Sequence, residues 1–228
     1  MDDGSGTADR AAFAQSLSAL KDRGSNLLVV GAALEGAHRE ACDRLLGEIE
    51  EEPRRRVFVR TDGSSGCGLG PTANTNGAHA KVVVQAAQTR SAASVTCTHP
   101  GIPTTEVAEK DLGALATEIV GAIDELAAAA ATGEPEPAEL RLCFDSLVPL
   151  FAEHDQEEVF RMLNLVTTRM RQFRGMGHYH LPTDPDERTV RLLEPLFDAV
   201  IELRVRDGRP EHNWRLVSRD VESGWLPL

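Results

Sequence analysis

The sequence predicts an α/β fold with a mostly parallel central sheet, helices on both of its faces and an antiparallel hairpin at the C-terminus. Short, continuous apolar runs of strand length recur along the 228 residues, and segments with apolar residues at helical spacing alternate with them. The last two strand patterns are joined by the turn dipeptide Asp207-Gly208. Continuous apolar runs are typical of strands buried on both faces of a parallel sheet, and the alternation with helices gives three layers.

The first half of the chain is predicted to form a βαβ unit followed by a third strand and a long helix. We expect strands over 27–30, 57–60 and 81–84, and helices over 13–20, 41–49 and 112–126. Residues 1–10 are small and polar, and we expect them to be disordered. Residues 62–79 are rich in Gly, Ser, Thr and Asn, which predicts a mobile loop.

The second half repeats this alternation and ends in the hairpin. We expect strands over 140–144, 176–181, 199–205 and 214–217, and helices over 159–173 and from near 184 to 197. The sequence has no internal repeat, and only a short stiff connector around residues 133–137 separates the halves. Residues 11–228 are therefore predicted to form one three-layer domain.

The charge balance restricts the partners of the chain. It has 24 basic and 36 acidic residues and a formal net charge of −12, which argues against sequence-independent binding to nucleic acid or to an anionic membrane. Only three basic residues are lysines: Lys21, Lys81 and Lys110. An acidic surplus with so little lysine is typical of a halophilic protein, although GC-rich coding also favours arginine over lysine.

The cysteines and the absence of long apolar runs indicate a soluble cytoplasmic protein. The four cysteines lie far apart without a C-x-x-C pair, and no secretory segment is visible at the N-terminus. A disulfide scaffold and a cysteine-based zinc site are therefore not the default expectations. Cys42 and Cys143 fall inside apolar patterns and are expected to be small core residues. No apolar run approaches the 18 or so residues that span a membrane.

The loop after the first core strand is where ligands bind in sheets of this kind. Gly31 and Gly36 have the spacing of the phosphate-binding pattern G-x-x-x-x-G-K-[ST] in a strand–loop–helix setting. The glycines of that pattern let backbone N–H groups surround the phosphates, its lysine reaches the outer phosphates, and its hydroxyl ligates magnesium. Here Ala37 stands in the position of the lysine, and His38 stands in the position of the hydroxyl.

A second element is relevant to a nucleotide site. Residues 140–144 form an apolar run that ends in Asp145-Ser146. A strand that ends in aspartate is typical of Walker B elements, whose carboxylate holds magnesium. The same pair could instead cap the turn that follows the strand.

Four stretches carry a resemblance to a known family. They are residues 24–31 (GSNLLVVG), 144–147 (FDSL), 177–180 (GHYH) and 196–203 (LFDAVIEL). In this order they resemble the KaiC/RAD55/GvpD branch of the RecA-like ATPases, and more narrowly its degenerate haloarchaeal, HTR-like members. The likeness covers roughly residues 11–228. It implies a RecA-like P-loop fold with a terminal hairpin.

The chain departs from the active members of that family. Active KaiC-like ATPases carry two glutamates after the second strand, one of which activates the attacking water, and Asp62 is the remaining candidate here. Losing the lysine and the magnesium hydroxyl removes much of the electrostatic stabilisation of phosphoryl transfer. The resemblance thus implies a degenerate Walker A site, a pseudo-ATPase and at most weak binding of ATP and magnesium, with Asp145 as the metal ligand. The vestigial nucleotide-binding positions are Gly31, Gly36, Ala37, His38, Asp145 and Ser146.

His178 and His180 form a separate candidate site. They are two residues apart on a predicted strand, so they share a face and could chelate a metal, with Asp184 or Asp186 as a third ligand. They could equally be exposed or capping histidines. Because this strand end approaches the γ-phosphate in RecA-like folds, they could also be a vestigial sensor.

Two functions of different classes follow from the sequence. The first is a non-hydrolysing RecA-like protein that acts in regulation or signalling through a protein partner. The second is an ATP-binding protein or weak ATPase, with Arg39 or His38 as a substitute cation. A structural subunit of a homo-oligomer is a third alternative.

Overall fold

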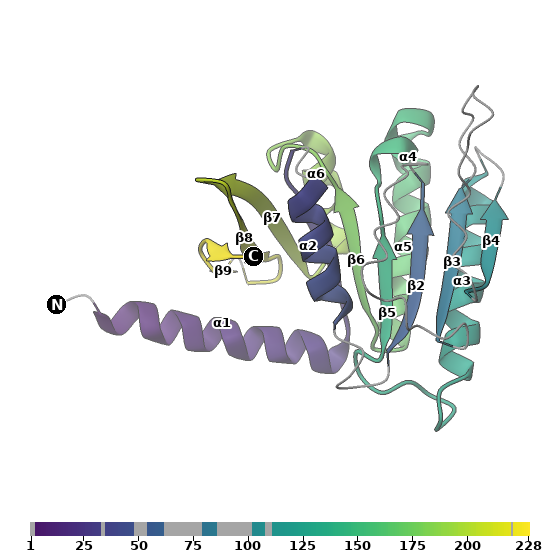
Figure 1. The fold of residues 1–228 in the computed structure, drawn as a ribbon, viewed down its shortest axis with the longest axis horizontal. Helices are drawn as coiled ribbons and strands as arrows, with labels where there is room; N and C mark the ends of the chain where they lie inside the picture. Colours follow the sequence, from purple (N-terminus) through teal and green to yellow (C-terminus); the bar gives the residue numbers. More distant parts are fainter. Residues whose placement is uncertain are drawn as a thin grey trace.

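The computed structural model describes residues 3–32, 35–47, 54–61, 79–85, 102–107, 111–219 and 221–228, with side chains from Phe13 onward. One sheet contains all strands of these ranges (Figure 1). The strands are β1 (Ser25–Val30), β2 (Arg55–Arg60), β3 (Ala80–Gln85), β4 (Thr104–Val107), β5 (Leu140–Phe144), β6 (Met176–Leu181), β7 (Ala199–Arg206), β8 (Arg209–Leu216), β9 (Val221–Glu222) and β10 (Leu226–Pro227).

The sheet is mixed but mostly parallel. Its order is β10-β8-β7-β1-β6-β5-β2-β3-β4, and β9 pairs with the end of β8. Every pairing along the order from β7 through β1, β6, β5, β2 and β3 to β4 is parallel. In contrast, β8 runs antiparallel to β7, β9 and β10. This arrangement confirms the predicted mostly parallel sheet with an antiparallel C-terminal hairpin.

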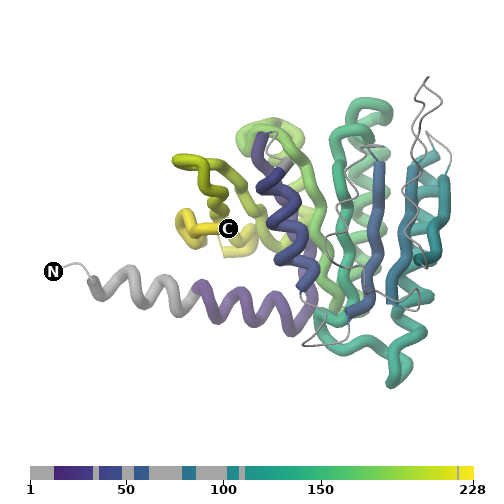
Figure 2. Tube along the Cα trace, viewed as in Figure 1, coloured from purple at the N-terminus to yellow at the C-terminus, as the bar shows by residue number. Residues whose placement is uncertain are grey.

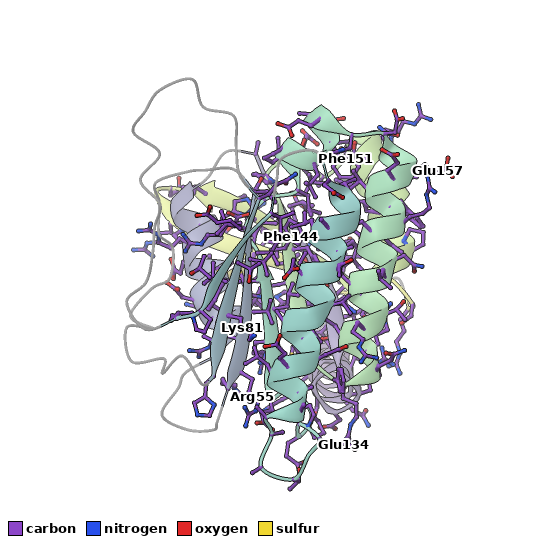
Figure 3. The ribbon with its side chains drawn as sticks, turned by 90° about the vertical axis from the view of Figure 1, so that its right-hand side faces the viewer. Arg55, Lys81, Glu134, Phe144, Phe151 and Glu157 are labelled. Carbon is purple, nitrogen blue, oxygen red and sulfur yellow. The ribbon has the colours of Figure 1, made fainter. Side chains whose placement is uncertain are left out.

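Helices cover both faces of the sheet. On one face lie α1 (Asp3–Arg23) and α2 (Glu35–Leu46), with α2 in front of β6 in Figure 1. The other face carries α3 (Leu112–Ala128) and α5 (Gln156–Gln172), which run side by side along the sheet in Figure 3. The short elements α4 (Val148–Glu153), α6 (Arg188–Leu193) and a 3₁₀ turn (Glu194–Leu196) complete the described helices.

The apolar core is divided between the two faces. The larger cluster joins the sheet to α3 and α5 and includes Ile119, Phe144 and Val166. A smaller cluster on the α1 face includes Phe13 of α1 and the C-terminal residue Leu228. In Figure 2 the C-terminus accordingly lies above α1. All six residues of β1 are buried, as expected for a central strand that is covered on both faces.

Some features differ from the predictions, and one predicted segment lies outside the described residues. β4 was not predicted, because it is a four-residue edge strand with two exposed positions and no apolar run. α1 extends into residues 1–10, for which the sequence predicts disorder. The predicted mobile loop, 62–79, lies outside the described residues except for its last residue. Within the described part of the chain, no helix combines the length and the apolar character that a membrane crossing requires.

The charge of −12 predicts a salt-dependent stability. Repulsion between carboxylates opposes the compact state, and counterions screen that repulsion. We expect the melting temperature to be about 5 °C or more higher in molar KCl than in dilute buffer. The control is a charge-balanced α/β protein of similar size, measured by the same thermal scans. An equal rise in that control would show that the effect does not come from the acidic surplus.

Candidate functional site

The sequence candidates converge at one edge of the sheet. Parallel strands place their carboxyl ends together, and the register pairs Val30 at the end of β1 with Leu181 at the end of β6. On the other side of β6, Phe144 at the end of β5 pairs with Tyr179. The loop before α2 and the Asp145-Ser146 pair therefore lie at the same edge of the sheet as the end of β6.

The residues of the phosphate-loop pattern have different surroundings. Gly31 has a positive φ of 132° and donates its N–H to the carbonyl oxygen of Thr183, over 2.9 Å. Gly36 is the second residue of α2 and is exposed. Ala37 is 4% exposed and packs into the apolar cluster on this face. The side chain of a lysine at position 37 would therefore begin inside this apolar cluster.

His38 is held between a backbone carbonyl and a second histidine. Its Nε2 lies 3.0 Å from the carbonyl oxygen of Gly31, and its Nδ1 lies 2.9 Å from His180 Nδ1. Burial is the main reason why the pKa of His38 falls to about 4, and the neighbouring His180 lowers it further. His38 is therefore neutral at pH 7 and carries no charge toward this edge of the sheet.

Asp145 connects the ends of β2 and β5. Its Oδ1 accepts hydrogen bonds from the backbone N–H of Thr61 (3.0 Å) and of Ser146 (2.6 Å), and from the Thr61 hydroxyl (3.2 Å). The Ser146 hydroxyl in turn accepts from the N–H of Val148 at the start of α4, over 3.3 Å. These contacts match the capping interpretation of the pair. Asp62 lies outside the described residues.

His178 and His180 are core residues. They are 1% and 3% exposed, which contradicts the expectation that they are exposed. Asp184 and Asp186 are exposed, and the structure does not place them with the two imidazoles. Instead, the histidines form a compact group with Cys42 and Cys143, in which one ligand atom from each residue lies within 4.8 Å of the others.

The two thiols of this group are in direct contact with each other and with an imidazole. Cys42 Sγ lies 3.2 Å from Cys143 Sγ and 3.3 Å from His178 Nε2. The hydrogen bond with Cys143 lowers the pKa of Cys42, and the same bond and burial raise the pKa of Cys143. Burial lowers the pKa of His178, against the opposing effect of the neighbouring Cys42. Metals bind cysteine as the thiolate and histidine as the neutral imidazole.

Comparison with known proteins places the chain in a family. The model of DUF7504, described as a family of unknown function, matches residues 24–203. This range is well over half of the 228 residues. The chain belongs to the DUF7504 family. No curated protein matches it.

The part of the chain that matches DUF7504 contains the whole candidate site. Residues 24–203 start just before β1 and end within β7, so they include α2, β5 and β6 with their cysteines and histidines. The whole of α1 (Asp3–Arg23) and the last strands, β8 to β10, lie outside the match. The site therefore belongs to the DUF7504 portion of the chain.

Sequence reasoning found the two histidines of this DUF7504 site but not the thiols. His38 and Cys42 are four residues apart and thus lie on one face of α2. Cys143 on β5 is the register partner of His178 on β6, so their side chains share a face of the sheet. The sequence does contain the patterns H-x-x-x-C (His38 to Cys42) and H-x-H (His178 to His180) and a cysteine in a strand. These patterns indicate one common site only when the order of the strands in the sheet is known.

Proposed function

We propose that this DUF7504 protein is a RecA-like P-loop scaffold that does not hydrolyse ATP and acts in regulation or signalling through a protein partner. The resemblance in sequence suggests the scaffold, and the mostly parallel sheet with its terminal hairpin is compatible with it. A cytoplasmic location and a halophilic, haloarchaeal origin belong to the same proposal.

The contacts of both ring nitrogens of His38 are the main observation that supports the proposed loss of hydrolysis. An active phosphate loop needs a hydroxyl at this position that reaches magnesium. Both ring nitrogens of His38 are engaged inside the protein, one with the Gly31 carbonyl and one with His180. Neither nitrogen is available to a metal–phosphate complex unless one of these contacts breaks.

The neighbouring positions support the same conclusion. Ala37 supplies no cation and packs into the core. Oδ1 of Asp145 is surrounded by three donors from Thr61 and Ser146, an arrangement that stabilises the junction of β2 and β5. Removing one preorganised donor from an active site lowers kcat by about 10²–10³, and here two elements of the phosphate site are replaced.

The proposed action through a partner is supported by apolar side chains on the antiparallel C-terminal strands. Val205 on β7 is 46% exposed, Val221 on β9 is 37% exposed and Leu226 on β10 is 38% exposed. A partner that binds along these strands would cover these side chains. The partner can be another protein or a second copy of the chain.

The test of this function is ATP titration and turnover with the full chain. Calorimetric titration of ATP with magnesium in molar KCl should give weak or no heat of binding. Phosphate release should not exceed that of a sample without protein. The reason is that the outer phosphates meet neither the lysine nor the magnesium hydroxyl of an active loop.

Two substitutions separate true activity from contamination. Asp145→Asn removes the carboxylate of the Walker B-like position, and Asp43→Asn changes an exposed aspartate on α2 as a matched control. Magnesium-dependent ATP hydrolysis that is lost in Asp145→Asn but kept in Asp43→Asn would contradict the proposal. Circular dichroism of both variants verifies that they are folded.

A further inference from the structure

The buried group of two cysteines and two histidines has the composition of a metal centre. Cys42 comes from α2, Cys143 from β5, and His178 and His180 from β6. Their exposed fractions are 8%, 6%, 1% and 3%. We propose that these four side chains bind one zinc ion. This inference goes beyond the proposed function and does not depend on it.

The donor set selects the metal. Two thiolates and two neutral imidazoles form the Cys₂His₂ set that tetrahedral zinc sites use. The group contains no carboxylate, so it does not suit magnesium or calcium, which prefer oxygen ligands. Four protein ligands also fill the coordination sphere of tetrahedral zinc, which makes the centre structural rather than catalytic.

The spacing of the donor atoms fits one ion. Usual Zn–S and Zn–N lengths with tetrahedral angles place neighbouring ligand atoms about 3.3–3.8 Å apart. The observed separations are 3.2 Å between the two sulfurs and 3.3 Å between Cys42 Sγ and His178 Nε2. The largest separation in the group is 4.8 Å. Shifts of about 1 Å or less therefore bring all four atoms to coordination distance.

His38 fixes which nitrogen of His180 is free for the metal. The carbonyl oxygen of Gly31 can only accept a hydrogen bond, so His38 Nε2 must carry the proton. His38 Nδ1 is then an acceptor, and the proton between the two rings lies on His180 Nδ1. This assignment leaves a lone pair on His180 Nε2, a buried atom without a hydrogen-bond partner among the described residues.

His38 is thus a positioning residue, and zinc would satisfy the orphaned nitrogen. A ligand histidine whose other nitrogen donates to a fixed partner is the usual outer-shell arrangement of zinc sites. Here the relay runs from His180 through His38 to the backbone of Gly31. The metal would join α2 to β5 and β6 in the middle of the sheet. This position is beside the loop between β1 and α2, where the resemblance places the nucleotide.

The first experiment uses the wild-type full chain. After treatment with a chelator and a phosphine reductant, the apo protein is titrated with Co²⁺ and then with Zn²⁺ in molar KCl. We expect one Co²⁺ per chain, with the visible bands of tetrahedral cobalt and a thiolate charge-transfer band, and displacement by one Zn²⁺. Zinc in large excess over its Kd should raise the melting temperature by about 10 °C.

Variants assign the ligands and the positioning residue. Cys143→Ser and His180→Gln should each weaken zinc binding at least 100-fold and change the cobalt spectrum. His38→Gln should weaken binding about 10–100-fold but keep one cobalt per chain and the thiolate band. His212→Gln, a change on β8, which β7 and β1 separate from β6 in the sheet, should bind as the wild type does.

The wild-type titration alone can overturn the proposal, whatever happens to the folding of the variants. Apo protein that is folded by circular dichroism but takes up no zinc, or takes up cobalt without a thiolate band, would show that the group is a hydrogen-bonded core cluster. Unchanged zinc affinity in folded Cys143→Ser protein would also overturn it.

Discussion

Gly31→Ala is expected to lower the free energy of unfolding by about 3–5 kcal/mol, because the substitution combines backbone strain with overlap. Gly31 has a φ of 132°, a value that side chains with a Cβ rarely adopt. A Cβ at this position would overlap the backbone oxygen of Leu203 on β7. The backbone cannot move away easily, since the N–H of Gly31 is bonded to Thr183 and its carbonyl to His38.

Gly36→Ala is the matched control, and its effect should have the opposite sign. Apart from its own helix and chain neighbours, no atom of the described residues lies within 4 Å of a Cβ built on Gly36, which belongs to α2. Alanine is the better helix former, so this variant should be neutral or up to about 1 kcal/mol more stable. Urea denaturation followed by circular dichroism measures both. A loss below about 1 kcal/mol for Gly31→Ala would show that the turn can relax.

This pair of variants also bears on the interpretation of the loop motif. A glycine-rich pattern predicts close approach of a ligand to the backbone. At Gly31 the close neighbour is instead the backbone of β7, whereas at Gly36 no other described element lies within 4 Å of the position of a Cβ. The requirement for glycine at position 31 therefore follows from its close approach to β7 in the strand-to-helix connection. A bound phosphate is not needed to explain it.

The central strands were predictable from the sequence because burial on both faces produces continuous apolar runs. β1 and β5 are buried at every position, and the runs over 27–30 and 140–144 fall within them. β4 gave no such signal, because only Val107 of its four residues is buried. Local patterns thus reveal strands in the middle of this sheet better than strands at its edge.

The metal-binding group could not be predicted from local patterns. Cys42 and Cys143 are 101 positions apart, and they meet because α2 packs over β5 and β6. The order of the strands, with β6 between β1 and β5, is what brings Cys143 beside His178. The H-x-H pair was visible in the sequence because both histidines lie on one strand, where a period of two places them on one face.

A buried ion pair at the other end of the sheet gives the second large expected effect. Arg55 at the start of β2 contacts Glu139, which directly precedes β5, with 2.8 Å between Nε and Oε1. Figure 3 labels Arg55 at the lower end of the sheet. The two residues are only 5% and 7% exposed. Glu139 also accepts the backbone N–H of Glu136 over 2.9 Å, so it orders the chain that enters β5.

Glu139→Ala is expected to lower the free energy of unfolding by about 3–5 kcal/mol, because it leaves the Arg55 guanidinium buried without its counter-charge. The exposed pair of Arg161 and Glu157 on α5 is the matched control, and Glu157→Ala should cost less than about 0.5 kcal/mol. The double variant Arg55→Met/Glu139→Leu should recover most of the loss, since the cost comes from the unpaired charge rather than from the missing attraction. Urea denaturation of the three variants decides between these causes. If the double variant is as unstable as Glu139→Ala, the contribution of Glu139 lies in its bond to Glu136 and not in the ion pair.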